Sequence, residues 1–94
     1  MIIPDKIKIG NYYYDIKLVE EFSLHCLGRG ALLKQSILLN SEASQELKEE
    51  TFIHEIIHQI LGQRSFSNED KNETLIDSLA AGLYQVFKDN DLLK

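Results

Sequence analysis

The residues best suited to chemistry in this chain are two histidines and a glutamate in the run His54-Glu55-Ile56-Ile57-His58. Side chains four positions apart on an α-helix lie on the same face, one turn apart. His54 and His58 could therefore bind one metal ion together, and the Glu55 carboxylate could take a proton from a water on that metal. This combination predicts a zinc-dependent hydrolase. The alternative is an amphipathic helix that carries two surface histidines and a glutamate.

A catalytic zinc ion normally takes three protein ligands and leaves a fourth position to water. The longer pattern H-E-x-x-H-x-x-G-x-x-H is not met, because Leu61 and Arg64 occupy its glycine and third histidine positions. Glu73 and Asp77 are four residues apart and would share a face of a second helix. We expect Glu73 to give an oxygen to the metal and Asp77 to accept the ring N–H of one histidine. The alternative is that both are solvated charges on an acidic helix.

With the histidine motif, the run Asn72-Glu73-Thr74-Leu75-Ile76-Asp77 resembles the N-E-x-x-x-D signature of gluzincins, the thermolysin-like metallopeptidases. The chain looks most like the minimal gluzincins and the small H-E-x-x-H proteins of phages, prophages and mobile elements, including the ImmA/IrrE-like group. The resemblance spans residues 37–89 and implies that Glu73 is the third zinc ligand and Asp77 orients a zinc-binding histidine. It also implies that an edge strand, here Ile37-Leu38-Leu39-Asn40, pairs with the backbone of an extended peptide substrate.

Two further residues are candidates for contact with the substrate or the transition state. Tyr84 lies seven residues after Asp77 on the same helical face, and Arg64 follows the first helix. Larger gluzincins supply a His or Tyr for this purpose from a further subdomain, and no such subdomain fits in this sequence. The alternatives are that Tyr84 packs against a neighbouring element and that the Arg64 side chain is solvated at the surface.

The elements that would position these residues form one α+β domain, residues 1–94, with a sheet in residues 1–40 and helices in residues 41–94. Alternating apolar and polar residues around the turn dipeptide Gly10-Asn11 predict a hairpin over residues 7–20. Residues 31–34 and 36–39 predict two short strands, or one longer strand with a bend. We therefore expect a small antiparallel sheet of three or four strands, in a minimal zincin-like arrangement.

Two helices are predicted to follow, packed on each other and on the sheet. The first begins near Ser41 or Ser44, either of which can cap it, and runs to the residue before Gly62, the expected C-terminal stop. Residues 67–70 have the spacing of a capping box, and a second amphipathic helix is predicted over residues 69–89.

Composition and charge restrict the partners that this chain can have. Ten Lys and Arg against fifteen Asp and Glu give a formal net charge of −5, and the basic residues are scattered. This excludes a nucleic-acid-binding surface, which needs clustered Lys and Arg. Neither a membrane-spanning run nor a signal-peptide pattern is present, and the single cysteine, Cys26, excludes an internal disulfide. We therefore expect a cytoplasmic protein.

Together these patterns predict a small zinc metallopeptidase that acts on a peptide or protein substrate, since two histidines and a glutamate suit zinc best. The alternative from another class is a zinc-binding regulatory or partner-binding protein without peptidase activity. Its site would be closed by a fourth ligand such as His25 or Cys26, although a lone cysteine is also commonly a small buried apolar residue. A third hypothesis is a metal-free interaction module.

Overall fold

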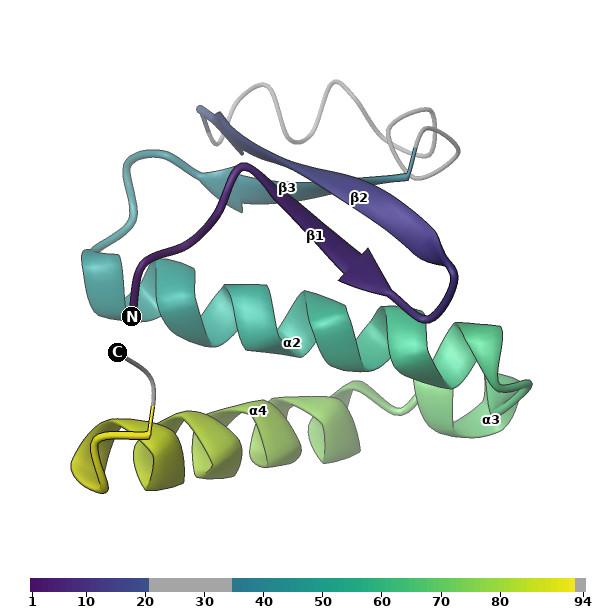
Figure 1. Ribbon diagram of the computed structural model, residues 1–94. Helices are drawn as coiled ribbons and strands as arrows, with labels where there is room; N and C mark the ends of the chain where they lie inside the picture. The colour runs from purple at the N-terminus through teal and green to yellow at the C-terminus, as the bar shows by residue number, and fades with distance from the viewer. Residues whose placement is uncertain (21–34, 93–94) are drawn as a thin grey trace.

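A three-stranded sheet, helix α2 across one face of it, and helix α4 on the other side of α2 form the layers of this protein (Figure 1). The computed structural model describes residues 1–20 and 35–92. The predicted α+β order, with the strands before the helices, is confirmed. The strands are β1 (Lys6–Ile9), β2 (Tyr12–Val19) and β3 (Ser36–Asn40), and the helices are α2 (Gln45–Gln63), the short α3 (Ser67–Asp70) and α4 (Glu73–Asp89).

The sheet is mixed rather than wholly antiparallel. Strands β1 and β2 form the predicted hairpin, but β2 pairs with β3 in parallel, with Asp15 opposite Ser36 and Val19 opposite Asn40. A parallel pair needs a crossover of about a dozen residues or more, and the chain between Val19 and Ser36 is long enough to supply one. The predicted strand over residues 31–34 lies outside the described residues, as do His25 and Cys26.

Helix α2 is packed on two sides, and this fixes the direction of its remaining side chains. Toward the sheet, Phe52 is buried in a cluster that includes Ile37 and Leu39, both almost fully inaccessible to solvent. On the opposite side α4 packs on α2, and its buried residues are Ile76 and Ala80. Burial of apolar surface on both sides prevents α2 from rotating about its axis, because any rotation would expose part of the core.

The C-terminal end of α2 is tied to the β1–β2 hairpin by Gln63. Its amide Nε2 donates to the carbonyl oxygen of Ile9 at 3.0 Å and to the hydroxyl of Tyr14 at 2.9 Å. Gly10 at the hairpin turn has a φ of 61°, which glycine adopts readily, and a Cβ there would clash with the Gln63 side chain. These contacts with the hairpin therefore fix the position of α2 along its own axis, relative to the sheet.

The second helix is interrupted, which the sequence did not indicate. Residues 67–70 form the separate helix α3, and Asn72 begins α4 because its side-chain oxygen accepts the Leu75 backbone N–H at 3.1 Å. Helix α2 begins as predicted, with the Ser44 hydroxyl accepting the Leu47 N–H, but it continues past Gly62 to Gln63. Within the described residues, none of the helices combines the length and the apolar character needed to span a bilayer.

A buried carboxylate, Glu49, joins α2 to α4 at the end away from α3. Its side chain is 8% exposed and accepts hydrogen bonds from the Tyr84 hydroxyl at 2.8 Å and from the Gln45 amide at 2.9 Å. Burial raises the pKa of Glu49, but these two hydrogen bonds and the positive charges of the N-terminus and Lys88 outweigh it, so the pKa lies below its ordinary value. Burial and the Glu49 carboxylate together raise the pKa of Tyr84 to about 12.

We predict that the Tyr84–Glu49 contact stabilises the fold only while Glu49 is ionised. A carboxylate whose pKa is lower in the folded state contributes stability above its unfolded pKa, and the contribution is lost as the pH falls through the folded pKa. Tyr84→Phe should cost about 1–2 kcal/mol in the free energy of unfolding at pH 7, and less near pH 4. Urea denaturation at the two pH values measures this difference. An equal cost at both would contradict the charge-assisted bond.

Candidate metal centre

Two histidines of α2 and the first residue of α4 bring three metal-ligating atoms together. The Nε2 atoms of His54 and His58 lie 3.1 Å apart. The Glu73 carboxylate meets both of them, with Oε1 at 3.0 Å from His58 Nε2 and Oε2 at 3.3 Å from His54 Nε2. Ligand atoms placed tetrahedrally at 2.0–2.1 Å from a zinc ion lie about 3.3 Å from one another. The three residues are therefore close enough to hold one metal ion.

Each imidazole is held from behind by its own aspartate. His54 Nδ1 lies 2.8 Å from Asp77 Oδ1, and His58 Nδ1 lies 2.7 Å from Asp70 Oδ1. A carboxylate only accepts hydrogen bonds, so each Nδ1 must carry the proton that it donates. The tautomer of both neutral rings is thereby fixed, with the lone pair on Nε2 directed at the shared space. Metal-binding histidines typically have such a carboxylate partner.

The groups that line the space between these rings are all hydrogen-bond acceptors, so the space favours a positive charge. With both Nδ1 atoms acting as donors, the two Nε2 lone pairs and the Glu73 carboxylate face one another at 3.0–3.3 Å as three acceptors. Three acceptors at this separation repel unless a proton or a cation lies between them. The donor set therefore fits a metal ion, because its chemistry and its spacing both favour one.

The electrostatics of His58 follow the same pattern. Burial lowers the pKa of this imidazole, but the hydrogen bond to Asp70 and the negative charges of Glu73, Glu55 and Asp70 outweigh burial and raise the pKa above its ordinary value. Positive charge is thus favoured at this position despite partial burial. A bound cation would compete with that proton, so metal affinity should fall as the pH is lowered.

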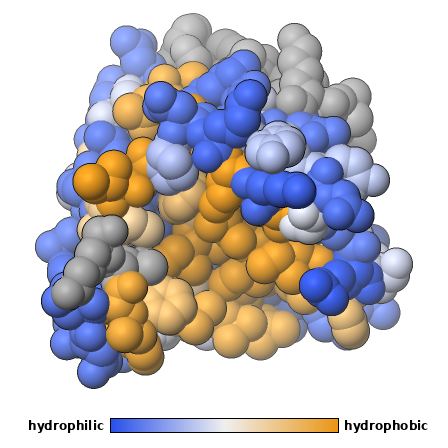
Figure 2. Space-filling model, in the orientation of Figure 1, coloured by the Kyte–Doolittle hydropathy of each residue, from blue (hydrophilic) through white to orange (hydrophobic). Residues whose placement is uncertain are grey.

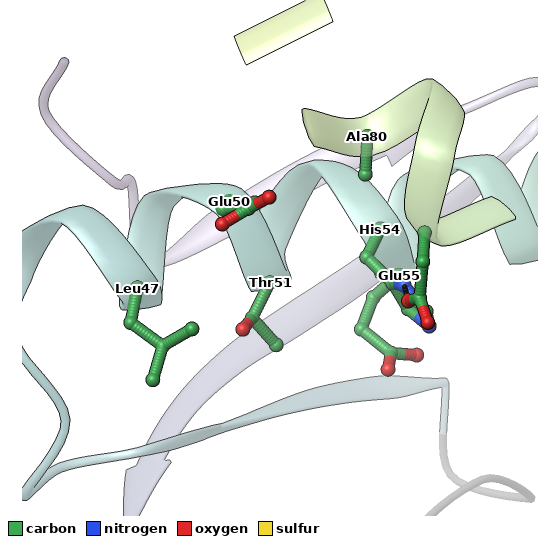
Figure 3. Close-up of a pocket in the computed structure, with 7 residues that line it drawn as sticks. Leu47, Glu50, Thr51, His54, Glu55 and Ala80 are labelled. Carbon is green, nitrogen blue, oxygen red and sulfur yellow. Dashed lines mark ion pairs between the residues drawn. The ribbon is translucent and has the colours of Figure 1, made fainter. Parts of the chain in front are cut away.

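Glu55 lies beside the metal-ligating group without belonging to it. Figure 3 shows its side chain leaving α2 on the side of β3, while Ala80 of α4 lies on the other side of His54. Among the described residues the Glu55 carboxylate forms no hydrogen bond and no ion pair. Burial raises the pKa of Glu55, the imidazoles of His54 and His58 oppose this, and the charges of Glu73 and Asp70 add to it, so the net shift is upward.

Two clefts open on either side of His54 and Glu55, which line both. One cleft has a volume of about 450 Å³ and is also lined by His58, Gln59, Gly62, Asp70 and Glu73. The other, of about 320 Å³, is lined by residues from the two preceding turns of α2 together with Asp77 and Ala80 (Figure 3). A ligand could therefore extend past the candidate metal position in both directions.

Tyr84, proposed above as a transition-state or substrate contact, does not lie at this site. The seven residues from Asp77 to Tyr84 carry the chain about 10 Å along the helix axis. The Tyr84 hydroxyl instead donates to Glu49, and the ring lines a separate hollow with Met1 and Lys88. The shared helical face was predicted correctly, but Tyr84 packs near the N-terminal end of α2 instead of reaching the metal-ligating group.

Arg64, the other proposed contact, is also away from the two clefts. It caps α2 through its backbone N–H, which donates to the Ile60 carbonyl at 3.1 Å. Its side chain is exposed and forms no ion pair or hydrogen bond within the described part of the chain. Ser65, with a φ of 66°, turns the backbone away directly after it.

Strand β3, which was predicted to pair with a substrate, lies at one side of the described sheet. Among the three described strands it pairs only with β2, so its other side is an edge in that sheet. Ile37 and Leu39 point into the core, whereas Leu38 and Asn40 are partly exposed. Figure 3 shows β3 passing on the side of α2 toward which Glu55 projects.

Sequence reasoning missed Asp70, which the structure places against His58. The residue lies in a stretch interpreted only as the cap of a helix, and its position depends on the break between α3 and α4. The signal in the sequence that could have indicated its role is that Asp70 carries a carboxylate three residues before Glu73. Gln59, which lines the larger cleft, was also missed.

Searches against protein-family models, curated protein sequences and solved structures found no match to this chain. Inference about its function therefore depends on the geometry of the site.

We predict that the two aspartates contribute comparably to metal binding. Asp70→Asn and Asp77→Asn keep the shape of each side chain but remove the charge that holds one imidazole, and each should weaken zinc binding about 10–100-fold. Competition with a chromophoric chelator measures the affinity. Glu69→Asn, a change of the exposed neighbour of Asp70, is the matched control and should leave the affinity unchanged. An Asp70→Asn protein with normal affinity would contradict the role given to Asp70.

Metal binding should also stabilise the fold, because the ligands come from two separate helices. A ligand that binds only the folded state at 1,000 times its Kd adds about 4 kcal/mol to the free energy of unfolding. Zinc should therefore raise the Tm of the wild-type protein, and a chelator should reverse the rise. His58→Ala should abolish the zinc-dependent shift. A shift that persists in this variant would place the metal elsewhere.

Proposed function

We propose that this protein is a small zinc-dependent peptidase. The observation that carries the proposal is the combination of the metal-ligating group with a partly buried carboxylate, Glu55, that has no partner among the described residues. A metal site that only stabilises the fold requires the metal ligands, but it does not require a carboxylate such as that of Glu55 beside them. The metal-ligating group found in the described residues has three members, the number that a catalytic zinc ion takes.

Zinc is the metal that the donor set supports best, since two imidazoles and one carboxylate suit it better than they suit magnesium or calcium. When bound, zinc would supply Lewis-acid polarisation and would lower the pKa of a water ligand. His54 and His58 would hold it through Nε2, and Glu73 would add an anionic oxygen. Asp70 and Asp77 keep the two rings in the required tautomer.

Glu55 would act as the general base. Its carboxylate can accept a proton from the attacking water and then deliver that proton to the leaving amine of the cleaved peptide. The clefts on both sides of His54 would hold the substrate chain, and the edge of β3 that is unpaired among the three described strands would pair with its backbone by strand addition. An extended peptide is the substrate that this arrangement favours.

The second candidate is a zinc-binding protein that recognises a partner without cleaving it. The position of Tyr84 and Arg64 favours this alternative, because neither side chain reaches the clefts to stabilise a transition-state oxyanion. Gln59 lines the larger cleft, and in the peptidase its amide would be the candidate for that purpose. The two candidate functions differ in the role of Glu55, which is required for catalysis in the peptidase and has no catalytic role in the partner-binding protein.

We predict that Glu55→Gln keeps zinc and loses hydrolysis. The amide is isosteric but cannot accept the proton, so the rate of peptide cleavage should fall at least about 100-fold with zinc affinity preserved. A quenched fluorescent peptide library with zinc-loaded protein measures the rate, and Glu42→Gln, an exposed site outside both clefts, serves as control. Cleavage retained by Glu55→Gln would exclude the general-base role. Zinc binding without cleavage by the wild-type protein would favour the second candidate.

A further inference from the structure

The smaller cleft beside the metal-ligating group has a lining suited to one kind of side chain. Leu47, Glu50 and Thr51, from the two turns of α2 that precede His54, form one wall, and Ala80 of α4 lies across from them (Figure 3). Its volume of about 320 Å³ is at the lower end of ligand pockets, and it has room for a single long side chain.

Apolar surface and a negative charge are both present in this cleft. Leu47 is 52% exposed and offers an apolar surface against which an aliphatic chain can lie, whereas Ala80 is 1% exposed and only closes the cleft on the α4 side. Glu50 is partly buried, and within the described part of the chain its carboxylate has no ion pair and no hydrogen bond. Asp77 adds a second negative charge, although it is already bound to His54. None of the described lining residues is Lys or Arg.

The geometry points to a subsite for a lysine or arginine side chain of the substrate, next to the bond that is cleaved. The methylene groups would lie on Leu47, and the cationic end would reach the Glu50 carboxylate. Because the cleft shares His54 and Glu55 with the metal-ligating group, a side chain held there belongs to a residue close to the attacked carbonyl. This inference rests on the proposed peptidase function and names its substrate class.

The other classes of side chain fit the cleft less well. An apolar side chain would remove water from Glu50 without giving it a hydrogen-bond donor, and the cost of desolvating a carboxylate would offset the apolar contact. An acidic side chain would be repelled by Glu50 and Asp77. A basic side chain alone uses both the apolar wall and the charge.

The experiment compares peptides that differ at one position only, carrying lysine, norleucine or glutamate on either side of the cleaved bond. Zinc-loaded wild-type protein is assayed for kcat/KM, and zinc-loaded Glu55→Gln protein is assayed for binding of the same peptides. Lysine should be preferred over norleucine about tenfold, as expected for one partly desolvated charge pair. Glu50→Gln should reduce this ratio to near one, and Glu50→Lys should reverse it in favour of glutamate.

Glu42→Gln is the control variant, since it removes the same charge from an exposed position outside both clefts. Unchanged zinc affinity in both Glu50 variants shows that their fold and their metal-ligating group are intact. Peptides that are cleaved or bound without a preference for lysine would overturn the subsite but not the peptidase proposal. Zinc-loaded protein that neither cleaves nor binds any of the peptides would overturn both.

Discussion

Two imidazole–aspartate hydrogen bonds determine what this site can do. Each bond is charge-assisted, and each fixes the proton of one histidine on Nδ1. The lone pairs of both rings then have one direction left to them, toward each other and toward Glu73. Without the aspartates either ring could turn over or exchange its tautomer, and the three acceptors would no longer converge. This arrangement of carboxylates and imidazoles is what makes the site suitable for a cation.

The rest of the fold holds α2 and α4 in a fixed position relative to each other. Phe52 and the buried residues of β3 hold one side of α2, while Ile76 and Ala80 lie on the α4 side. Gln63 fixes one end of α2 to the hairpin, and the Tyr84–Glu49 bond fixes the helix pair near the other end. In so small a core each of these contacts is a large share of the stability, and a metal that bridged the two helices would add to it.

The sequence predicted the parts of the site that depend on helical periodicity alone. His54, His58, Glu73 and Asp77 are pairs at i and i+4, so their common faces follow from local structure wherever the helices lie. Asp70 could not be predicted in the same way, because its position depends on the break at Asn72 and on the angle between α3 and α4. Tyr84, in contrast, was predicted to lie at the site and does not. Its face was predicted correctly, but its height on α4 is set by packing against Glu49.

In the sheet, too, the sequence predicted the local structure but not the contacts between residues far apart in the chain. The β1–β2 hairpin follows from Gly10-Asn11 and the alternating residues around it, which are all local signals. The parallel pairing of β3 with β2 is decided by partners far apart in the chain, and an alternating strand is equally compatible with either direction. The carboxylates of Glu50 and Glu55, which have no partner within residues 1–20 and 35–92, are likewise a property of the packed helices that composition and spacing do not reveal.

X-ray absorption at the zinc edge of the purified, zinc-loaded protein tests the central claim most directly. Our account predicts only nitrogen and oxygen neighbours, with outer-shell scattering from two imidazoles and one position taken by water. Loss of imidazole scattering in the His54→Ala and His58→Ala proteins would identify the two rings. A sulfur neighbour at about 2.3 Å, or a spectrum that neither substitution changes, would contradict the site described above.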